Sequence, residues 1–305
     1  MKILILGSAG LVGSSLGRVL SKVNDYEILK ASRADANLFD LSETKELIKS
    51  FHPNVVINAA AKVGGIVANN TDRTEFILEN LKINIKVLES LIPYPTIKLI
   101  NLGSSCIYPL GTEVPIAEEK LMTGKLEPTN SPYAMAKLTA IEMGSALAIQ
   151  YGHKIINLMP TNLYGPNDSF SETNSHVIPG LIYRMHKSKI NSQNNFKVWG
   201  TGKPLREFLY VDDLADSINF IIQNNIEEEI LNVGSGEEVS IRDLVNKIKE
   251  VVNYDGEVYF DSSIPDGNPR KLLNSSKINN LGWKSKVSLD DGLVKAYDWF
   301  KKNVT

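Results

Sequence analysis

The chain has 305 residues, of which 43% are hydrophobic and 22% are charged, and its formal net charge at neutral pH is -2. This length and apolar content are enough for one large core, or for one and a half domains, of a soluble α/β enzyme. Acidic and basic residues are interspersed, so we expect neither nucleic acid nor an anionic membrane as a partner.

The first residues, Met1 to Leu4, lack the features of a signal peptide, and no apolar stretch approaches the ~20 residues of a membrane span. A cytoplasmic location is therefore expected. The single cysteine, Cys106, excludes an intrachain disulfide and a metal site built from several thiolates. The four histidines show no metal-binding spacing, so no metal is predicted.

A glycine-rich turn follows the first predicted strand. Residues 2–6 form a short apolar run typical of a buried parallel strand, and a helical pattern covers residues 11–22. Three glycines between them allow a tight turn, a close approach of the backbone to a pyrophosphate, and packing of helix on strand. The pattern predicts a dinucleotide-binding site. Its predicted cofactor contacts are Gly7, Gly10, Leu11, Val12 and Gly13.

The second predicted strand, residues 26–31, ends in Ser32 and Arg33. An NAD-binding chain would carry Asp or Glu here for the ribose hydroxyls, whereas a cationic Arg beside a Ser suits a 2'-phosphate. This favours NADP as the cofactor, although Arg33 could also be a solvated loop charge. Asp40 and Leu41 are placed to reach the edge of the adenine.

Strand-like runs and helical patterns alternate over the first half of the chain. The strand-like runs are 2–6, 26–31, 54–59, 97–102 and 154–159, and the helical patterns are 11–22, 43–50, 72–91 and 131–150. This alternation predicts an α/β fold with a Rossmann-type, doubly wound parallel sheet. The segments 72–91 and 131–150 could pack across a homodimer interface as a four-helix bundle, although burial within one chain explains them equally well.

Tyr133 and Lys137 stand four residues apart, so they share one face of the predicted helix. A neighbouring ammonium favours the phenolate, and we expect it to lower the pKa of Tyr133 from its ordinary value of ~10. Tyr133 would then be a usable proton donor near neutral pH. The alternative is that a long helix carries this pair by chance.

After Pro160 the alternation breaks into Gly, Pro, Asn and Ser, which predicts a boundary to a smaller α/β lobe. We expect this carboxy-terminal lobe to contain a helix over 176–187, a strand over 196–199 and the tail from about 240. Segments 211–223 and 230–233 are expected to return to the main sheet. The predicted domains are 1–165 with about 207–235 for the cofactor, and 166–206 with 236–305 for the substrate.

Four motifs follow one another along the chain: the glycine-rich turn, Gly103–Pro109, the pair Tyr133 and Lys137, and Arg206–Asp213. In this order they resemble the motifs of the extended short-chain dehydrogenase/reductase family. More narrowly, the chain resembles the GDP-L-fucose synthases of that family from residue 1 to about 283. The strings that carry this resemblance are Ala59–Ile66, Pro160–Pro166, Asn174–Pro179, Val198–Gly202 and Pro265–Leu273.

The resemblance implies an NADPH-dependent enzyme that inverts C3 and C5 of GDP-4-keto-6-deoxy-D-mannose and then reduces C4. A ketone at C4 acidifies the hydrogens on both neighbouring carbons, so inversion needs an acid–base group on each side of the ring and donors on the carbonyl oxygen. By resemblance, Ser104 and Tyr133 are those donors, and Lys137 also holds the nicotinamide ribose. Cys106 is the thiolate base and His176 the imidazolium acid. Alternatively, Cys106 is a small buried hydrophobic residue and His176 a helix-capping or core histidine.

The resemblance also implies the binding residues of both ligands. The implied substrate contacts are Arg184, Trp199, Arg206 and Asp266, with Lys187 as a second cation one helical turn after Arg184. Further implied cofactor contacts are Ala60, Lys137, Asn162, Leu163 and His176. For the arginines and Trp199, surface charge and core packing are the alternatives.

Departures from the family pattern leave other functions open. Ser8 and Ala9 stand where the family often has a basic residue, and Ser169 and Gly180 replace the more usual Asn and Ala near the sugar pocket. One alternative is a C4-reductase of a related GDP-4-keto-6-deoxy sugar, such as a heptose, without epimerisation. A second is a non-catalytic NADPH sensor, against which stands the intact set Ser104, Tyr133 and Lys137.

Overall fold

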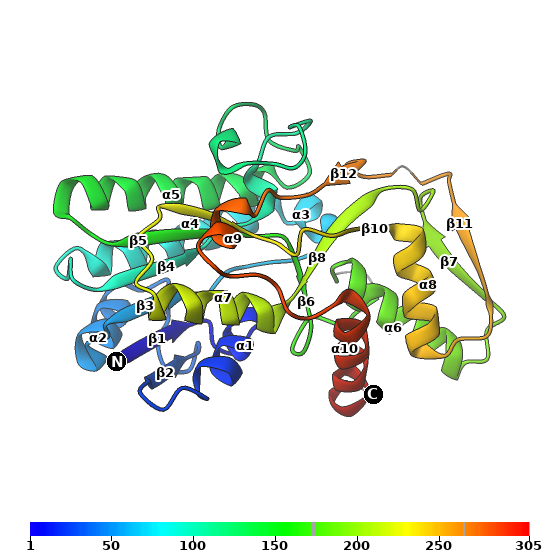
Figure 1. The fold of residues 1–305 in the computed structure, drawn as a ribbon, viewed down its shortest axis with the longest axis horizontal. Helices are drawn as coiled ribbons and strands as arrows, with labels where there is room; N and C mark the ends of the chain where they lie inside the picture. The colour runs from blue at the N-terminus through cyan, green and yellow to red at the C-terminus, as the bar shows by residue number, and fades with distance from the viewer. Residues whose placement is uncertain (173–174, 265, 305) are drawn as a thin grey trace.

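The computed structural model describes residues 1–172, 175–264 and 266–304. Asn174 and Pro265, which belong to two of the motif strings, lie outside the described residues. Figure 1 shows the large sheet with its helices on one side and a second group of strands and helices, ending in the carboxy-terminal helix, on the other.

The main sheet has six parallel strands in the order β2-β1-β3-β4-β5-β9. Their bounds are Lys2–Leu6 for β1, Glu27–Ala31 for β2, Val55–Asn58 for β3, Lys98–Leu102 for β4, Ile155–Pro160 for β5 and Ile230–Val233 for β9. The Rossmann-type parallel sheet predicted from the alternating pattern is confirmed, and 230–233 joins it beside β5.

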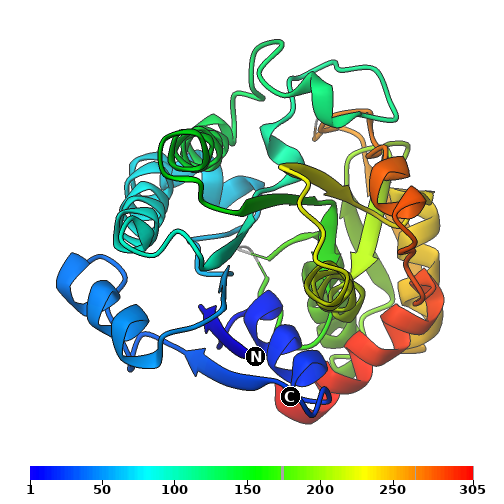
Figure 2. The ribbon, with the colours of Figure 1, turned by 60° about the vertical axis from the view of Figure 1, so that its left-hand side comes forward.

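Helices cover both faces of this sheet, as Figure 2 shows. Helices α1 (Leu11–Leu20) and α7 (Val211–Gln223) pack on one face, and α2 (Leu41–Phe51), α4 (Arg73–Leu91) and α5 (Ser131–Tyr151) lie on the other. Because successive strand residues point to opposite faces, Ile3 and Ile5 join the core under α1 and α7, and Leu4 and Leu6 join the other core. Each such side chain contributes about 1.5–3 kcal/mol by its burial.

A second lobe has its own core, which includes Ile182, Phe196, Leu244 and Phe300. Strands β6 (Asn162–Tyr164), β8 (Leu205–Tyr210), β10 (Glu238–Ser240) and β12 (Arg270–Lys271) form one sheet, and β7 (Asn195–Trp199) pairs with β11 (Glu257–Asp261). Its helices are α6 (Val177–Ile190), α8 (Ile241–Val252) and α10 (Leu289–Asn303). Strands β6 and β8 pair with each other outside the main sheet, although most of their residues fall within the segments predicted for the cofactor domain.

Four short elements complete the fold. They are the helices α3 (Ile66–Thr71) and α9 (Ser276–Asn280) and the 3-10 helices η1 (Ser105–Ile107) and η2 (Glu118–Lys120). The first 3-10 helix directly follows the carboxyl end of β4, and it therefore lies at the edge of the sheet where ligands bind in folds of this kind.

The strand order reverses between β1 and β3, so a crevice is expected outside the carboxyl ends of these two strands. Gly7 follows β1 with φ +77°, and a Cβ added to it would lie 2.7 Å from the Cα and N atoms of Ala60. A Cβ on Gly13 would lie 2.1 Å from the carbonyl oxygen of Gly7. Both positions therefore require glycine, and they hold β1, β3 and α1 in contact at this edge.

Gly7→Ala is expected to lower the free energy of unfolding by about 2–4 kcal/mol, because it combines an alanine at positive φ with a clash against backbone atoms. Gly111→Ala is the matched control, since Gly111 has φ +76° and an added Cβ would meet no atom within 4 Å. The control should lose only about 1–2 kcal/mol. Urea unfolding followed by circular dichroism measures both, and equal losses would contradict the close packing of Gly7 on Ala60.

Candidate active site

The turn after β1 leaves the amino end of α1 open to an anion. Helix α1 begins after Gly10, which has no side chain to cap it. The first hydrogen bond within the helix is donated by the Ser14 amide to the Gly10 carbonyl. The N–H groups of the first turn and the helix dipole thus point toward a ligand at the crevice. A Cβ added to Gly10 would meet only the Gly7 carbonyl oxygen, at 3.7 Å, so the backbone is open at this position and the predicted cradle fits the phosphates of a dinucleotide.

The end of β2 has the polar turn expected for the ribose side of the cofactor. The amide and hydroxyl of Ser32 both donate to Asp35 Oδ2, at 2.7 and 2.8 Å, and Arg33 is exposed on this turn. Asp40 caps α2 by accepting from the amides of Ser42 and Glu43. Its carboxylate therefore has a structural role beyond the adenine contact predicted from the sequence.

Tyr133 and Lys137 share one face of α5, as predicted, but their electrostatics differ from the sequence expectation. The Lys137 ammonium is buried, lies 5.8 Å from the centre of the Tyr133 ring and donates to the Leu102 carbonyl at 2.7 Å. Burial lowers the pKa of Lys137 to about 8. Burial also raises the pKa of Tyr133, as does the nearby Cys106, and a hydrogen bond with Ser104 offsets this only in part. The expected lowering of the Tyr133 pKa is thus not seen, because burial and the charge of Cys106 outweigh the effect of Ser104.

Ser104 links the groups at the end of β4. Its Oγ accepts from the Cys106 amide at 3.1 Å and so caps the 3-10 helix η1. The same side chain lowers the pKa of both Cys106 and Tyr133. Ser104 therefore fixes the backbone of Cys106 and acts electrostatically on both Cys106 and Tyr133.

The Cys106 thiol lies beside a cation that the sequence analysis did not assign. Lys271 Nζ is 3.4 Å from Cys106 Sγ. Burial raises the pKa of Cys106, but the charge of Lys271, the hydrogen bond with Ser104 and the charge of His176 together hold it below its ordinary value. The only sequence signal for Lys271 was its place in the string Pro265–Leu273.

His176 stands at the start of α6 with its side chain 45% exposed, so a ligand can reach the ring. Its Nδ1 lies 3.9 Å from Oδ1 of Asp168, whose side chain is only 5% exposed. Burial lowers the pKa of His176, but Asp168, Cys106 and the Gly64 carbonyl raise it above its ordinary value. Asp168 thus favours the imidazolium, a role that sequence reasoning missed because the two residues are paired only by the fold.

Arg184 and Trp199 form a second group. The guanidinium lies 5.1 Å from the Trp199 ring centre and 5.3 Å from that of Phe196, and it donates to the Lys197 carbonyl at 3.2 Å. Trp199 is 48% exposed, so core packing does not account for it. Lys187 is exposed one turn further along α6, with its Nζ 5.7 Å from the Tyr183 ring centre.

Arg206 belongs to the group around Cys106. It donates to the Leu205 carbonyl at 2.8 Å; burial lowers its pKa, whereas Asp266 and Cys106 raise it. Asp266 accepts from the amide and hydroxyl of Thr201 at 2.9 and 2.6 Å and so holds the turn after β7.

Two of the predicted cofactor residues, Asn162 and Leu163, lie on β6. Asn162 Nδ2 donates to the Glu207 carbonyl at 2.8 Å, and Leu163 packs against the core of the main sheet. Both therefore help to fix β6 beside β8.

Other kinds of site find no support in the part of the chain that the structure describes. Within these residues, no three side chains of His, Cys, Asp or Glu gather in a way that could hold a metal ion. None of the helices in residues 1–172, 175–264 and 266–304 has the length and apolarity needed to cross a membrane.

Comparison with known proteins identifies close relatives. A profile of the NAD dependent epimerase/dehydratase family matches residues 3–234. The chain is 48% identical to GDP-L-fucose synthase 1 of Arabidopsis thaliana, over 99% of this chain and 94% of the relative. A GDP-L-fucose synthetase structure from Naegleria fowleri bound to NADP is 29% identical with a TM-score of 0.90, covering 99% of this chain and 94% of that one. A GDP-6-OMe-4-keto-L-xylo-heptose reductase from C. jejuni is 30% identical with a TM-score of 0.91, covering 99% and 97%.

In an NMR titration, His176 is expected to keep its proton to a higher pH than an ordinary histidine, whose pKa is about 6.5. Asp168→Asn should lower the His176 midpoint, because the substitution removes the carboxylate that stabilises the imidazolium. His186 is an internal control, since burial and neighbouring lysines lower its pKa and its ring bonds to Tyr297 instead. An unchanged His176 midpoint in Asp168→Asn would refute the pairing.

Proposed function

Since the chain belongs to the NAD dependent epimerase/dehydratase family and, within it, to the GDP-L-fucose synthases, we propose that it converts GDP-4-keto-6-deoxy-D-mannose to GDP-L-fucose. It is an NADP(H)-dependent oxidoreductase. The observation that carries the proposal is the arrangement at the carboxyl end of β4, where Ser104 binds the Cys106 amide and Lys271 contacts the thiol, together with the Lys137 ammonium beside the Tyr133 ring on α5.

The cofactor would be held by the glycine turn and by the end of β2. The amides after Gly10 would bind the pyrophosphate, and Arg33 would bind the 2'-phosphate. Lys137 would bind the nicotinamide ribose. When bound, NADPH supplies the hydride for C4.

In the epimerisation, the Cys106 thiolate would remove the proton next to the ketone, and the His176 imidazolium would return a proton to the opposite face. Both ionisation states are the ones that the surroundings favour, since the pKa of Cys106 is lowered and that of His176 is raised. Hydrogen bonds from Ser104 and Tyr133 would stabilise the charge that develops on the carbonyl oxygen.

In the reduction, Tyr133 would protonate the oxygen at C4. Its raised pKa keeps the phenol protonated at neutral pH, which is the form that an acid needs. The buried Lys137 would stabilise the phenolate that remains, and the Leu102 carbonyl fixes the position of its ammonium.

The nucleotide would extend toward the second lobe. Arg206, which lies opposite Lys271 where β8 pairs with β12, is the proposed partner of the pyrophosphate or sugar. Arg184, Lys187, Trp199 and Asp266 are the further proposed contacts of the nucleotide and hexose. The similarity to a heptose reductase supports a second candidate function, reduction of a GDP-4-keto-6-deoxy-heptose without epimerisation.

Without NADPH and in heavy water, the enzyme is expected to incorporate deuterium at C3 and C5 of GDP-4-keto-6-deoxy-D-mannose, as NMR would detect. Cys106→Ser should slow this exchange about 10²–10⁴-fold, because it removes the base, and should spare reduction of an already epimerised ketone. Tyr133→Phe is the matched variant that should retain cofactor binding and lose NADPH oxidation. If no deuterium is incorporated, and NADPH is oxidised rapidly with a GDP-4-keto-6-deoxy-heptose, the result would support the second candidate function, reduction without epimerisation.

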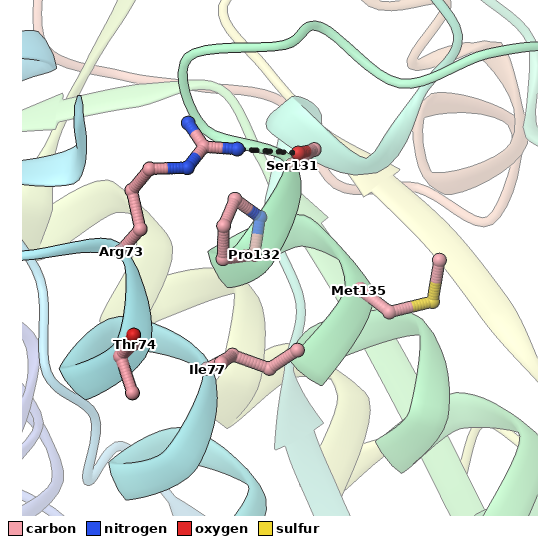
Figure 3. Close-up of a pocket in the computed structure, with 6 residues that line it drawn as sticks. All are labelled: Arg73, Thr74, Ile77, Ser131, Pro132 and Met135. Atoms are coloured by element: carbon pink, nitrogen blue, oxygen red, sulfur yellow. Dashed lines mark hydrogen bonds between the residues drawn. The ribbon is translucent and has the colours of Figure 1, made fainter.

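We also propose a homodimer formed by α4 and α5. Figure 3 shows the outer seam of these helices, where Arg73 donates to Ser131 at 3.3 Å. A pocket of about 380 Å³ lies here, lined by Arg73, Thr74, Ile77, Ser131, Pro132 and Met135. On α5, Met135 is 48% exposed and Ile149 85%, and their spacing places them on the same side of the helix. Apolar side chains in this arrangement fit a second copy of the same helix pair.

Met135→Glu is expected to shift the dimer toward monomer, because it places a charge in the apolar part of the proposed interface. Val294→Glu is the matched control, since Val294 is equally exposed but lies on α10. Analytical ultracentrifugation measures both variants. A monomeric wild-type protein, or equal effects of the two substitutions, would contradict this interface.

The cytoplasmic location stays a prediction.

A further inference from the structure

We propose that Lys271 is a positioning residue that keeps Cys106 in its thiolate form for proton abstraction. The proposal rests on the proposed function, in which Cys106 is the base of the epimerisation. It deepens that function by naming the residue through which the base is made available.

The position of Lys271 is set by the pairing of β12 with β8. These strands are parallel, with Lys271 opposite Arg206 and Arg270 opposite Leu205. Arg270 pairs with Glu238 at 2.6 Å, and successive strand side chains point to opposite faces, so Lys271 is directed the other way. There its ammonium reaches Cys106 Sγ at 3.4 Å.

A buried carboxylate fixes the strand that carries Lys271. Glu207 is fully buried, and its Oε2 accepts from the Leu273 amide at 3.0 Å, two residues after Lys271. Its Oε1 accepts from the Gly236 amide at 2.8 Å. This arrangement ties β12 to β8 and limits how far Lys271 can move from the thiol.

Other polar groups face Cys106 from the surrounding elements. They are Ser104 at the start of η1, Tyr133 on α5, His176 at the start of α6 and Arg206 on β8. Ser104 and Tyr133 carry no positive charge. Arg206 is a cation, but its guanidinium donates to the Leu205 carbonyl, whereas the ammonium of Lys271 contacts the sulfur itself.

His176 cannot replace Lys271 as the lasting cation. In the proposed reaction His176 gives up its proton to the sugar, so its positive charge is lost when it acts as the acid. The proposed reaction assigns no proton transfer to Lys271. A permanent cation in contact with the sulfur therefore has a task distinct from that of the histidine.

The test uses the fact that Cys106 is the only cysteine of the chain, so alkylation by iodoacetamide reports one thiol. The rate is measured against pH in the substrate-free enzyme. Lys271→Met, which keeps a long side chain without the charge, is expected to move the midpoint of this rate profile to higher pH and to lower the rate at neutral pH about tenfold. Lys271→Arg should keep the midpoint near that of the wild type.

Lys277→Met is the matched control, because Lys277 is an exposed lysine on α9 that pairs with Glu119 at 3.7 Å. Its alkylation profile should equal that of the wild type. Without NADPH, Lys271→Met should slow deuterium exchange into the substrate. With NADPH, the same variant should spare reduction of an already epimerised ketone. A merely structural role would not produce this difference between the two assays. Should the Met variant fail to fold, Lys271→Gln provides the same measurement.

A wild-type alkylation profile in Lys271→Met would overturn the proposal. An unchanged alkylation profile together with a higher KM for the GDP sugar would also overturn the proposal, since Lys271 would then bind the substrate phosphates alone. Failure of the proposed function gives a different result: the wild-type enzyme would show no exchange or turnover with the mannose derivative. A higher midpoint in Lys271→Met would support the Lys271–Cys106 interaction even then.

Discussion

The Cys106 thiol lies within 3.4 Å of the Lys271 ammonium and close enough to the His176 ring for each to shift the ionisation of the other. These three side chains come from the end of β4, from β12 and from the start of α6. The thiol alone would be protonated in such a half-buried place, because burial disfavours the charged form. The base of the proposed reaction therefore exists only when the second lobe is packed against the end of the main sheet.

Burial acts differently on the two parts of the site. On the cofactor side it raises the pKa of Tyr133 and lowers that of Lys137, so both groups are held nearer to their neutral forms. On the substrate side, charged partners outweigh burial and leave Cys106 and His176 nearer to their ionised forms. The candidate site thus combines a proton donor suited to reduction with a charged pair suited to epimerisation.

Buried polar contacts join the two lobes at this edge. Glu207 accepts from the amides of Leu273 and Gly236, and Asn232 on β9 accepts from the Tyr108 hydroxyl at 2.6 Å. The side-chain Nδ2 of Asn232 also donates to the carbonyls of Ile116 and Asn274. Because unpaired polar groups are costly in a buried place, these contacts fix the segments that carry Cys106 and Lys271 relative to the sheet.

Local patterns in the sequence determined the main sheet, the glycine turn at Gly7 and the shared helix face of Tyr133 and Lys137, because each depends on residues only a few positions apart. The resemblance to a family supplied Cys106 and His176 as candidates. Only the tertiary structure decided that Lys271 contacts the thiol, that Asp168 pairs with His176, and that Trp199 stays exposed. It also reversed the expected shift of the Tyr133 pKa. The physical reason is that distances between residues far apart in the chain, and the desolvation of a side chain, are set by how the two lobes pack and not by spacing along the sequence.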